Sequence, residues 1–141
     1  MTKDVQVYLR SRQYRHDGAD KEEIETTASG SYYEKNGRHF LVYDEIIEGI
    51  DTPVKNKVKF GENFLEIIKS GAVNVHMVFE ENKKNLTSYN IPYGNIMLGI
   101  DTKKIHIVQE SERIAVDVEY VLYMNYEYCA DCKIVMNIRS K

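Results

Sequence analysis

Apolar and polar residues alternate over two long segments near the C-terminal end of the chain, 113–125 and 127–139. The apolar positions of the first segment are Ile114, Val116, Val118, Tyr120, Leu122 and Met124, and those of the second are Tyr128, Ala130, Cys132, Ile134, Met136 and Ile138. Successive side chains of a strand point to opposite faces, so each segment predicts a strand with one apolar face. Strands of about a dozen residues must coil or close to bury such a face. The pattern predicts an all-β barrel or a strongly coiled sandwich.

The sequence leaves open how these two strands are connected. The apolar positions are even-numbered on both sides of the break, from Met124 to Tyr128. In an antiparallel pair this parity requires either a connection of odd length, such as 125–127, or a β-bulge.

Shorter alternating segments precede the long hairpin, and turn residues separate them at intervals of roughly ten residues. We expect strands at 4–14, 24–34, 54–60, 64–69, 73–80, 86–90 and 93–101, one more after the Asn36-Gly37 turn, and one that contains Ile105 and Ile107. Segment 64–69 is also compatible with a helical turn, and Gly94 and Gly99 are expected kinks. The chain as a whole, residues 1–141, is expected to form a single domain. Its architecture is predicted to be one antiparallel up-and-down β-barrel of about eight to ten strands.

The Asn36-Gly37 turn gives the strongest hairpin signal, because both residues tolerate the positive φ of a type I′ turn. A two-residue turn there places Tyr43 opposite Gly30, where the ring has room to lie across the glycine. By the same register, Glu45 lies opposite Ala28.

The composition is that of an ordinary soluble globular protein, with 43% hydrophobic and 29% charged residues. A formal net charge of −3 with interspersed signs argues against nucleic-acid binding, which needs a concentrated basic surface. The most basic stretch, 10–16, is either a solvated strand edge or an anion or RNA patch. No run approaches the roughly 20 apolar residues of a membrane helix, and residues 1–4 do not begin a signal segment. We expect a cytoplasmic protein without a nucleic-acid partner or membrane contact.

The two cysteines form a C-x-x-C motif, Cys129 and Cys132, inside a strand pattern. Residues i and i+3 of a regular strand point to opposite faces, so the thiols diverge unless a bulge intervenes. No helix follows to lower a thiol pKa, and no second pair completes a zinc site. We expect two ordinary reduced cysteines.

The sequence carries no motif of a known catalytic or metal site, so we expect no catalytic residue, metal or cofactor. His76 and His106 should point outward, because their neighbours form the apolar faces. Glu45 and Glu66 are the acids that can be placed near an inward face. The register through Ser70-Gly71 leaves the facing of Glu66 open, and with it that of Lys69.

Six short segments resemble, in order and spacing, the YwiB-like family of small uncharacterised bacterial proteins. They are 31–37, 42–45, 69–74, 77–80, 88–94 and 98–102, and the resemblance covers nearly the whole chain. It implies a calycin-like β-barrel, the architectural group of lipocalins and fatty-acid-binding proteins, in a soluble protein of Gram-positive-type bacteria. It supplies no function. Lys69 departs from the pattern, which usually has Arg there, so a bidentate contact to an acid would become a point-charge contact.

Small barrels of about eight strands have interiors that are filled by side chains or hold one small ligand. The polar residues expected near an inward face or a strand end are Tyr43, Glu45, Lys69, Tyr89, Tyr93 and Thr102. A lysine and tyrosines can hold an acidic group while methionines adapt around an apolar body. These residues predict a site for a small, partly apolar, acidic ligand.

Three alternatives stay open. Glu45 and Lys69 can form an ion pair that closes one end of a filled barrel. The chain can be an interaction module, in which Tyr123 and Val121 beside Val135 join a partner or a second copy as a homodimer. The third is a small hydrolase or isomerase that uses Glu45.

Overall fold

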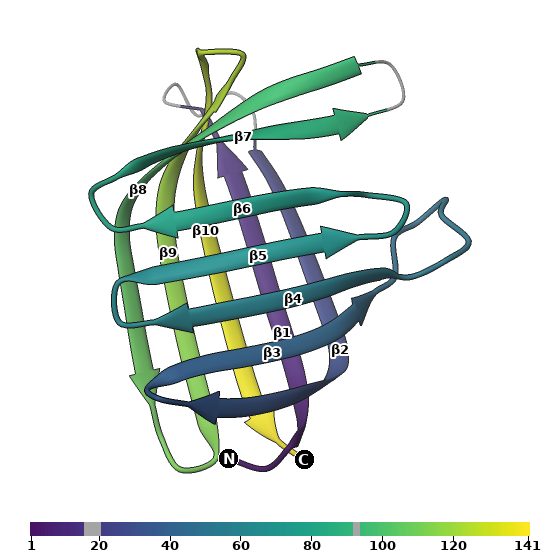
Figure 1. Ribbon diagram of the computed structural model, residues 1–141, viewed down its shortest axis with the longest axis vertical. Helices are drawn as coiled ribbons and strands as arrows, with labels where there is room; N and C mark the ends of the chain where they lie inside the picture. The colour runs from purple at the N-terminus through teal and green to yellow at the C-terminus, as the bar shows by residue number, and fades with distance from the viewer. Residues whose placement is uncertain (16–20, 92–93) are drawn as a thin grey trace.

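The computed structural model describes residues 1–15, 21–91 and 94–141, and within those residues it contains ten strands and no helix (Figure 1). The strands are β1 (Asp4–Tyr14), β2 (Lys21–Lys35), β3 (Arg38–Glu45), β4 (Val54–Gly61), β5 (Phe64–Ser70), β6 (Val75–Glu80), β7 (Lys84–Ile91), β8 (Gly94–Gln109), β9 (Arg113–Met124) and β10 (Glu127–Ser140). Segment 64–69 is therefore a strand and not a helical turn. The two strands expected around 93–101 and Ile105 are one continuous strand, β8.

All strands pair antiparallel with their neighbours, in the order β6-β5-β4-β3-β2-β1-β10-β9-β8-β7. The two strands at the ends of this order, β6 and β7, meet at an isolated bridge between Asn74 and Asn90. The sheet thus closes almost completely into a barrel. The predicted all-β barrel is confirmed, with ten strands.

The barrel is flattened into two layers whose strands cross at a steep angle. In Figure 1, β4, β5 and β6 run across the view in front of β1, β9 and β10, which run nearly vertically behind them. The longest strands, β2 and β8, run in both layers and join them. We call the layer of β3 to β7 the front layer and the layer of β1, β9 and β10 the back layer.

Of the two glycines expected to kink β8, Gly94 and Gly99, neither lies at the irregularity in its pairing with β9. Gly94 has a φ of 140°, a conformation that favours glycine. The pairing irregularity of β8 lies elsewhere, between Thr102 and Lys104, and not at Gly99. A bulge bends a strand without needing a glycine, and the sequence carries no comparable signal for it.

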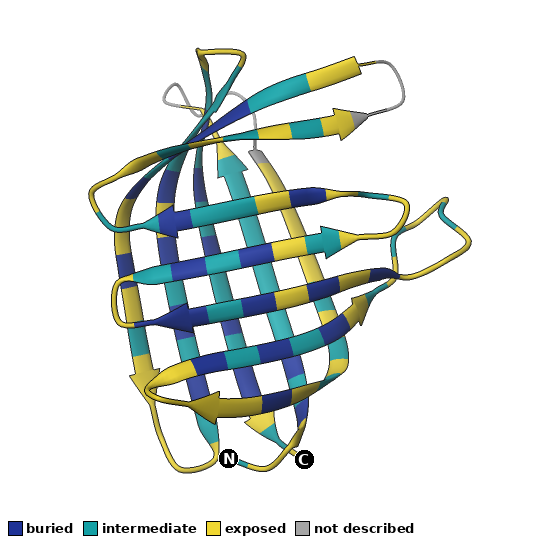
Figure 2. Cartoon of the chain, in the orientation of Figure 1, coloured by how far each residue is buried: buried dark blue, intermediate teal, exposed yellow. Residues whose placement is uncertain are grey.

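The core fills the space between the two layers. The largest fully buried side chains include Leu41, Phe60, Leu65, Phe79, Ile100, Ile114, Met136 and Ile138, and burying each contributes about 1.5–3 kcal/mol. Figure 2 shows the alternation of buried and less buried positions along the strands of both layers. Phe79 of the front layer meets Tyr120 of β9 edge to face, with ring centroids 4.9 Å apart. Side chains therefore close the barrel interior at that level.

Within the described ranges, no helix is long and apolar enough to cross a membrane.

The Asn36-Gly37 turn forms as its sequence predicts, and the structure decides how the last hairpin is connected. Asn36 and Gly37 have φ of 54° and 76°, and Tyr43 lies opposite Gly30 as predicted. In the last hairpin, Asn125 and Tyr126 form a two-residue turn with φ of 51° and 70°. The parity is corrected by a bulge between Tyr128 and Ala130. Of the two solutions that the sequence left open, the bulge is the one adopted.

Candidate functional site

Four polar side chains lie together on the inner faces of β3, β4 and β5: Tyr43, Glu45, Asn56 and Lys69. We call them the inner cluster. The ladder pairs Tyr43 with Asn56 and Asn56 with Lys69, and residues opposite each other in antiparallel strands share a face. Tyr43 and Asn56 are buried. The side chains of Lys69 and Glu45 are 22% and 17% exposed, so the cluster is largely withdrawn from water but reachable.

The Glu45 carboxylate joins the cluster. Lys69 Nζ donates to its Oε1 at 2.7 Å, and Asn56 Nδ2 donates to the same oxygen at 3.0 Å. The expected pairing of Glu45 with Ala28 is wrong. The ladder of β2 and β3 ends at the Gly30–Tyr43 pair, so Glu45 has no ladder partner on β2; on its other side it pairs with Val54 of β4.

Asn56 also presents an acceptor that has no partner. Its Nδ2 donates to the carbonyl oxygen of Val54 at 3.3 Å as well as to Glu45, and two acceptors on one side fix the orientation of the amide. Its Oδ1 is buried without a hydrogen bond. An unsatisfied buried acceptor costs about 1–3 kcal/mol. Asn56 was not among the predicted site residues, although it is the polar member at an inward position of the alternating segment 54–60.

The Tyr43 hydroxyl stays a neutral donor at physiological pH. Burial raises the pKa of its phenol well above the usual value, and the negative charge of Glu45 raises it further. The inner cluster therefore combines one carboxylate, one ammonium, one phenol and one amide.

The other predicted ligand-binding residues are spread more widely. Thr102 is buried on β8, and its Oγ1 has no hydrogen-bond partner. Tyr89 lies on β7 opposite Ile96 and is partly buried. Among the described residues, no hydrogen bond or ion pair joins Tyr89 or Thr102 to the inner cluster. Tyr93 lies outside the described residues.

A second polar cluster lies around His39, a buried residue at an inward position of β3. Its Nδ1 is 2.6 Å from the hydroxyl of Tyr32 and 3.5 Å from Oε2 of Glu34. The imidazole stacks on Phe60, with centroids 4.7 Å apart and planes inclined by 12°. Gln109 Nε2 donates to Glu34 at 3.4 Å. No local signal in the sequence indicates this cluster, because the inward facing of His39 follows only from the register that also orients Tyr43.

Burial dominates the protonation of this second cluster. It lowers the pKa of His39, while the charge of Glu34 acts in the opposite direction. Burial and then Glu34 raise the pKa of Tyr32 to about 12. A hollow of about 420 Å³ borders His39, Glu34, Glu62 and His106. The groups around it are acidic or neutral, so it offers no anion-binding charge.

The remaining chemistry-bearing residues do not form a site. His76 and His106 are exposed, as predicted. Glu66 faces outward and lies 2.7 Å from His76 Nε2, so it does not join Glu45 inside the barrel. In the described part of the chain, no group of three or more His, Cys, Asp or Glu residues is arranged to hold a metal ion.

The bulge at Tyr128/Ala130 changes the geometry of the cysteines. Cys129 is the extra residue of the bulge, and both cysteines pack against the core. The expected divergence of the thiols depended on a regular strand, which the structure does not have here. Both thiols are free.

Ten antiparallel strands around an apolar interior, with a small inward-facing polar cluster, define a small β-barrel protein. Comparison with protein families identifies its family. A family described as "Domain of unknown function (DUF1934)" matches residues 7–136, and the chain belongs to that family.

A curated relative and a solved structure support the same assignment. The chain is 26% identical over 127 residues to the "Uncharacterized beta-barrel protein YwiB" of Bacillus subtilis (strain 168), covering 90% of this chain and 88% of the relative. It is also similar to the crystal structure of the ywiB protein from Bacillus subtilis, with a TM-score of 0.76 and 22% identity over 100% of this chain and 95% of that one. The resemblance to the YwiB-like family is confirmed. At this identity the solved structure establishes the fold alone.

Proposed function

We propose that this barrel binds a small, partly apolar acid or alcohol at the inner cluster. The observation that carries the proposal is the buried, unpaired Oδ1 of Asn56 beside the ammonium of Lys69. Both side chains donate to the same oxygen of Glu45, so the amide of Asn56 and the ammonium of Lys69 lie next to each other. A ligand that satisfies both must offer a donor and an acceptor from one polar group.

The charge of the cluster selects this chemistry. Lys69 carries three donor hydrogens, and Glu45 takes one of them. A carboxylic acid donates its O–H to Asn56 Oδ1 and accepts from Lys69 Nζ through its carbonyl, while an alcohol does both with one oxygen. A fully ionised acid is disfavoured, because Glu45 already balances the lysine and repels a second carboxylate.

An apolar body of such a ligand has suitable surroundings. Met77 is partly buried and packs against the core from β6, whose residue Val75 lies opposite Lys69. Methionine side chains adapt to irregular apolar shapes. Binding sites of this kind are mostly apolar with a few convergent polar groups, and small barrels of the calycin type can hold one such ligand.

The alternative of an interaction module has less support. The ring of Tyr123 meets Tyr128 edge to face, with centroids 6.4 Å apart. Lys84 Nζ lies 3.8 Å from the Tyr123 ring centroid. Contacts within the chain therefore already occupy the residue expected to anchor a partner.

The proposal is tested by titrating the protein with dansyl-undecanol, an alcohol that is uncharged at neutral pH, and following the dansyl fluorescence. We expect saturable binding to one site. Asn56→Leu removes the unpaired acceptor without shrinking the side chain, and Lys69→Met removes the donor. Each should weaken binding about tenfold, which corresponds to the free energy of one hydrogen bond to a charged or buried group. Lys57→Met, which alters the outer face of the same strand, is the matched control and should bind as the wild type does.

Native mass spectrometry of protein purified from cells provides a second readout. A retained small molecule that Asn56→Leu no longer holds would support the proposal. Equal probe binding by Asn56→Leu and the wild type, or no saturable binding by either, would overturn it. Concentration-dependent light scattering that Tyr123→Glu abolishes would favour the interaction module instead.

A further inference from the structure

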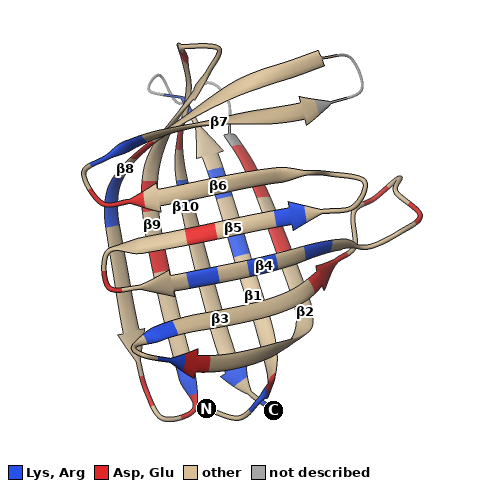
Figure 3. Ribbon diagram, viewed as in Figure 1, with Lys and Arg blue, Asp and Glu red and all other residues tan. Residues whose placement is uncertain are grey.

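A row of lysines follows the outer face of β4. Along this strand Val54, Asn56, Val58 and Phe60 are buried, and the residues that alternate with them are Lys55, Lys57 and Lys59. Side chains two residues apart on one face of a strand are about 6.6 Å apart. Figure 3 shows the resulting blue bands along β4 on the outside of the front layer.

Two acids lie opposite the lysine row in the ladders, Asp44 opposite Lys55 and Glu66 opposite Lys59. Among the described residues, no acid lies within ion-pair distance of Lys55, Lys57 or Lys59. Glu66 lies opposite Lys59 in the ladder, but its carboxylate is 2.7 Å from His76. The row is therefore free to contact an external anion.

Two stacked aromatic rings lie beside this row. Tyr33 of β2 and Phe40 of β3 are cross-strand partners, with ring centroids 4.7 Å apart and planes inclined by 9°. Tyr33 is 56% exposed. Lys59 Nζ lies 5.7 Å from the centroid of Phe40, which ties the lysine row to the rings. A hollow of about 510 Å³ lies between them, and its lining includes Tyr33, Phe40, Lys57, Lys59, Ile68 and the acid Glu66. We call it the outer groove.

We propose that the outer groove binds a short stretch of single-stranded nucleic acid. A base stacks on the exposed ring of Tyr33, extending the Tyr33–Phe40 stack, and successive phosphates contact the lysines of β4. Sheets that bind single strands combine the same two elements, aromatic stacking platforms and a positively charged track. An acidic peptide would satisfy the lysines equally well, but it carries a flat ring only where it has an aromatic residue, whereas every nucleotide carries one beside its phosphate.

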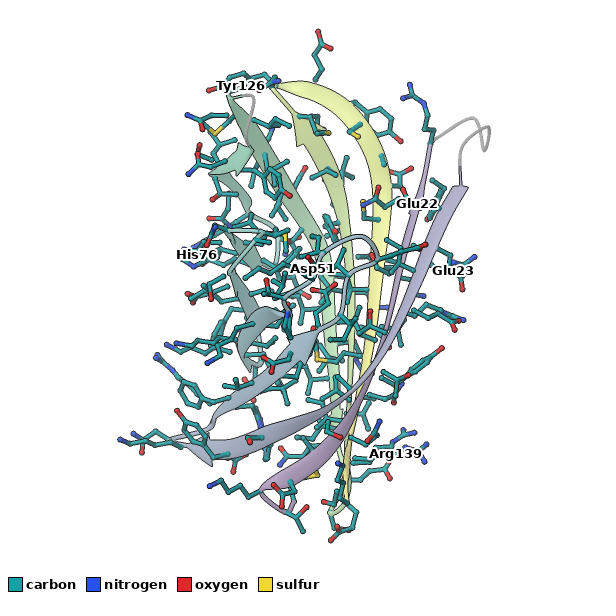
Figure 4. All side chains as sticks on the ribbon, turned by 90° about the vertical axis from the view of Figure 1, so that its right-hand side faces the viewer. Glu22, Glu23, Asp51, His76, Tyr126 and Arg139 are labelled. Atoms are coloured by element: carbon teal, nitrogen blue, oxygen red, sulfur yellow. The ribbon has the colours of Figure 1, made fainter. Side chains whose placement is uncertain are left out.

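The net charge of −3 gave the opposite expectation, because it averages over the whole surface. Three lysines on the outer face of β4 outnumber the two acids opposite them, Asp44 and Glu66. Figure 4 shows Glu22 and Glu23 on the side of the molecule opposite His76, which extends outward from the front layer. A nucleic-acid footprint requires a local excess of basic charge on one face, which β4 provides.

The proposal is tested by fluorescence anisotropy with fluorescein-labelled oligothymidylate at several salt concentrations. We expect saturable binding that weakens as salt rises. Three phosphate contacts predict a slope of log K against log[salt] of about −2, since each contact contributes about −0.7 for single strands. A duplex of the same length should bind more weakly, because its bases are not available for stacking.

Two pairs of variants separate the roles of the groove residues. Tyr33→Ala should weaken binding about tenfold, whereas Tyr14→Ala, which removes another exposed tyrosine, should not. Lys57→Gln should reduce the magnitude of the salt slope by about 0.7. Lys104→Gln makes the same charge change at an exposed position of β8 and should leave the slope unchanged.

Three results would overturn the proposal. The first is a lack of saturable binding at low salt, and the second is an equal loss of affinity in the groove variants and their controls. The third is that polyglutamate displaces the labelled probe as effectively as unlabelled oligothymidylate does. The last result would identify an acidic peptide as the occupant. Because the groove lies outside the barrel and the inner cluster inside it, Asn56→Leu should leave anisotropy unchanged, and this test is independent of the proposed interior ligand.

Discussion

The ammonium of Lys69 lies 2.7 Å from the carboxylate of Glu45, although β4 separates the strands that carry them. Asn56, on the intervening strand, donates to the same oxygen and holds it between the two charges. The two side chains are mostly shielded from water, so the pair differs from a surface ion pair. Removing one partner leaves the other charge without compensation in a poorly solvated place.

Lys69→Met is therefore expected to lower the free energy of unfolding by about 2 kcal/mol, between the cost of breaking a surface pair and a fully buried one. The double variant Glu45→Leu/Lys69→Met should recover most of the loss, because it removes both charges. Urea denaturation followed by circular dichroism measures both. A loss no greater than that of the exposed Lys55→Met would show that the pair contributes nothing to stability.

Gly30 is expected to tolerate no side chain. A Cβ added there would lie 2.8 Å from the carbonyl oxygen of Val42 and 3.3 Å from Tyr43 Cβ. Gly30→Ala should lower the free energy of unfolding by about 1–3 kcal/mol, the usual cost of overpacking. Thr27→Ala, at an exposed position of the same strand, should change it by less than about 0.5 kcal/mol. Equal midpoints of urea unfolding in the two variants would contradict the predicted clash.

His39 should make stability depend on pH. Its pKa in the folded protein is lowered by burial, whereas an unfolded histidine has a pKa of about 6.5. Below about pH 6.5 the unfolded chain binds a proton that the folded chain does not. The contribution of neutral His39 to the free energy of unfolding is therefore fully present above about pH 6.5. It is lost as the pH falls toward and through the pKa of His39 in the folded protein, by up to about 1.4 kcal/mol per pH unit.

Thermal unfolding midpoints measured across this pH range test the assignment. His39→Gln should flatten the dependence, and His106→Gln, at an exposed position, should retain it. Glu34→Gln should widen the window, because it removes the charge that favours the protonated imidazole. A profile unchanged in His39→Gln would assign the dependence to other groups.

The two cysteines should differ in reactivity. Burial raises the pKa of the Cys132 thiol to about 12, so it stays protonated at any pH near neutrality. Cys129, in the bulge, is partly exposed. Mass spectrometry after treatment with iodoacetamide should find Cys129 alkylated first in the native protein and both residues alkylated in urea. Equal native rates would mean that the hairpin opens to solvent.

Much of the fold could be read from local patterns. The alternation in 113–139 predicted two long strands, and Asn36-Gly37 predicted a turn that set the partner of Tyr43. Both signals depend only on neighbouring residues, so they can be interpreted without knowing how the rest of the chain folds. The exposed positions of His76 and His106 follow from the same alternation.

Local patterns predicted only part of the candidate site. Tyr43, Glu45 and Lys69 were recognised as candidates, but Asn56 was not, because its importance comes from the two strands that flank it. The facing of Lys69 depended on the register through Ser70-Gly71, which no local signal fixed. The lysine row was missed for a similar reason, since alternating lysines gain meaning only once β4 lies beside the rings of β2 and β3.

The sequence by itself determined which side chains share a face of each strand, because the period of a strand is a property of consecutive residues. Only the tertiary structure decided how the faces meet. The closure of β6 onto β7, the bulge that moves Cys129, and the approach of Lys69 to Glu45 across β4 all depend on how the sheet bends. Such bending arises from the packing of distant strands around a common core, and no short segment of the chain encodes it.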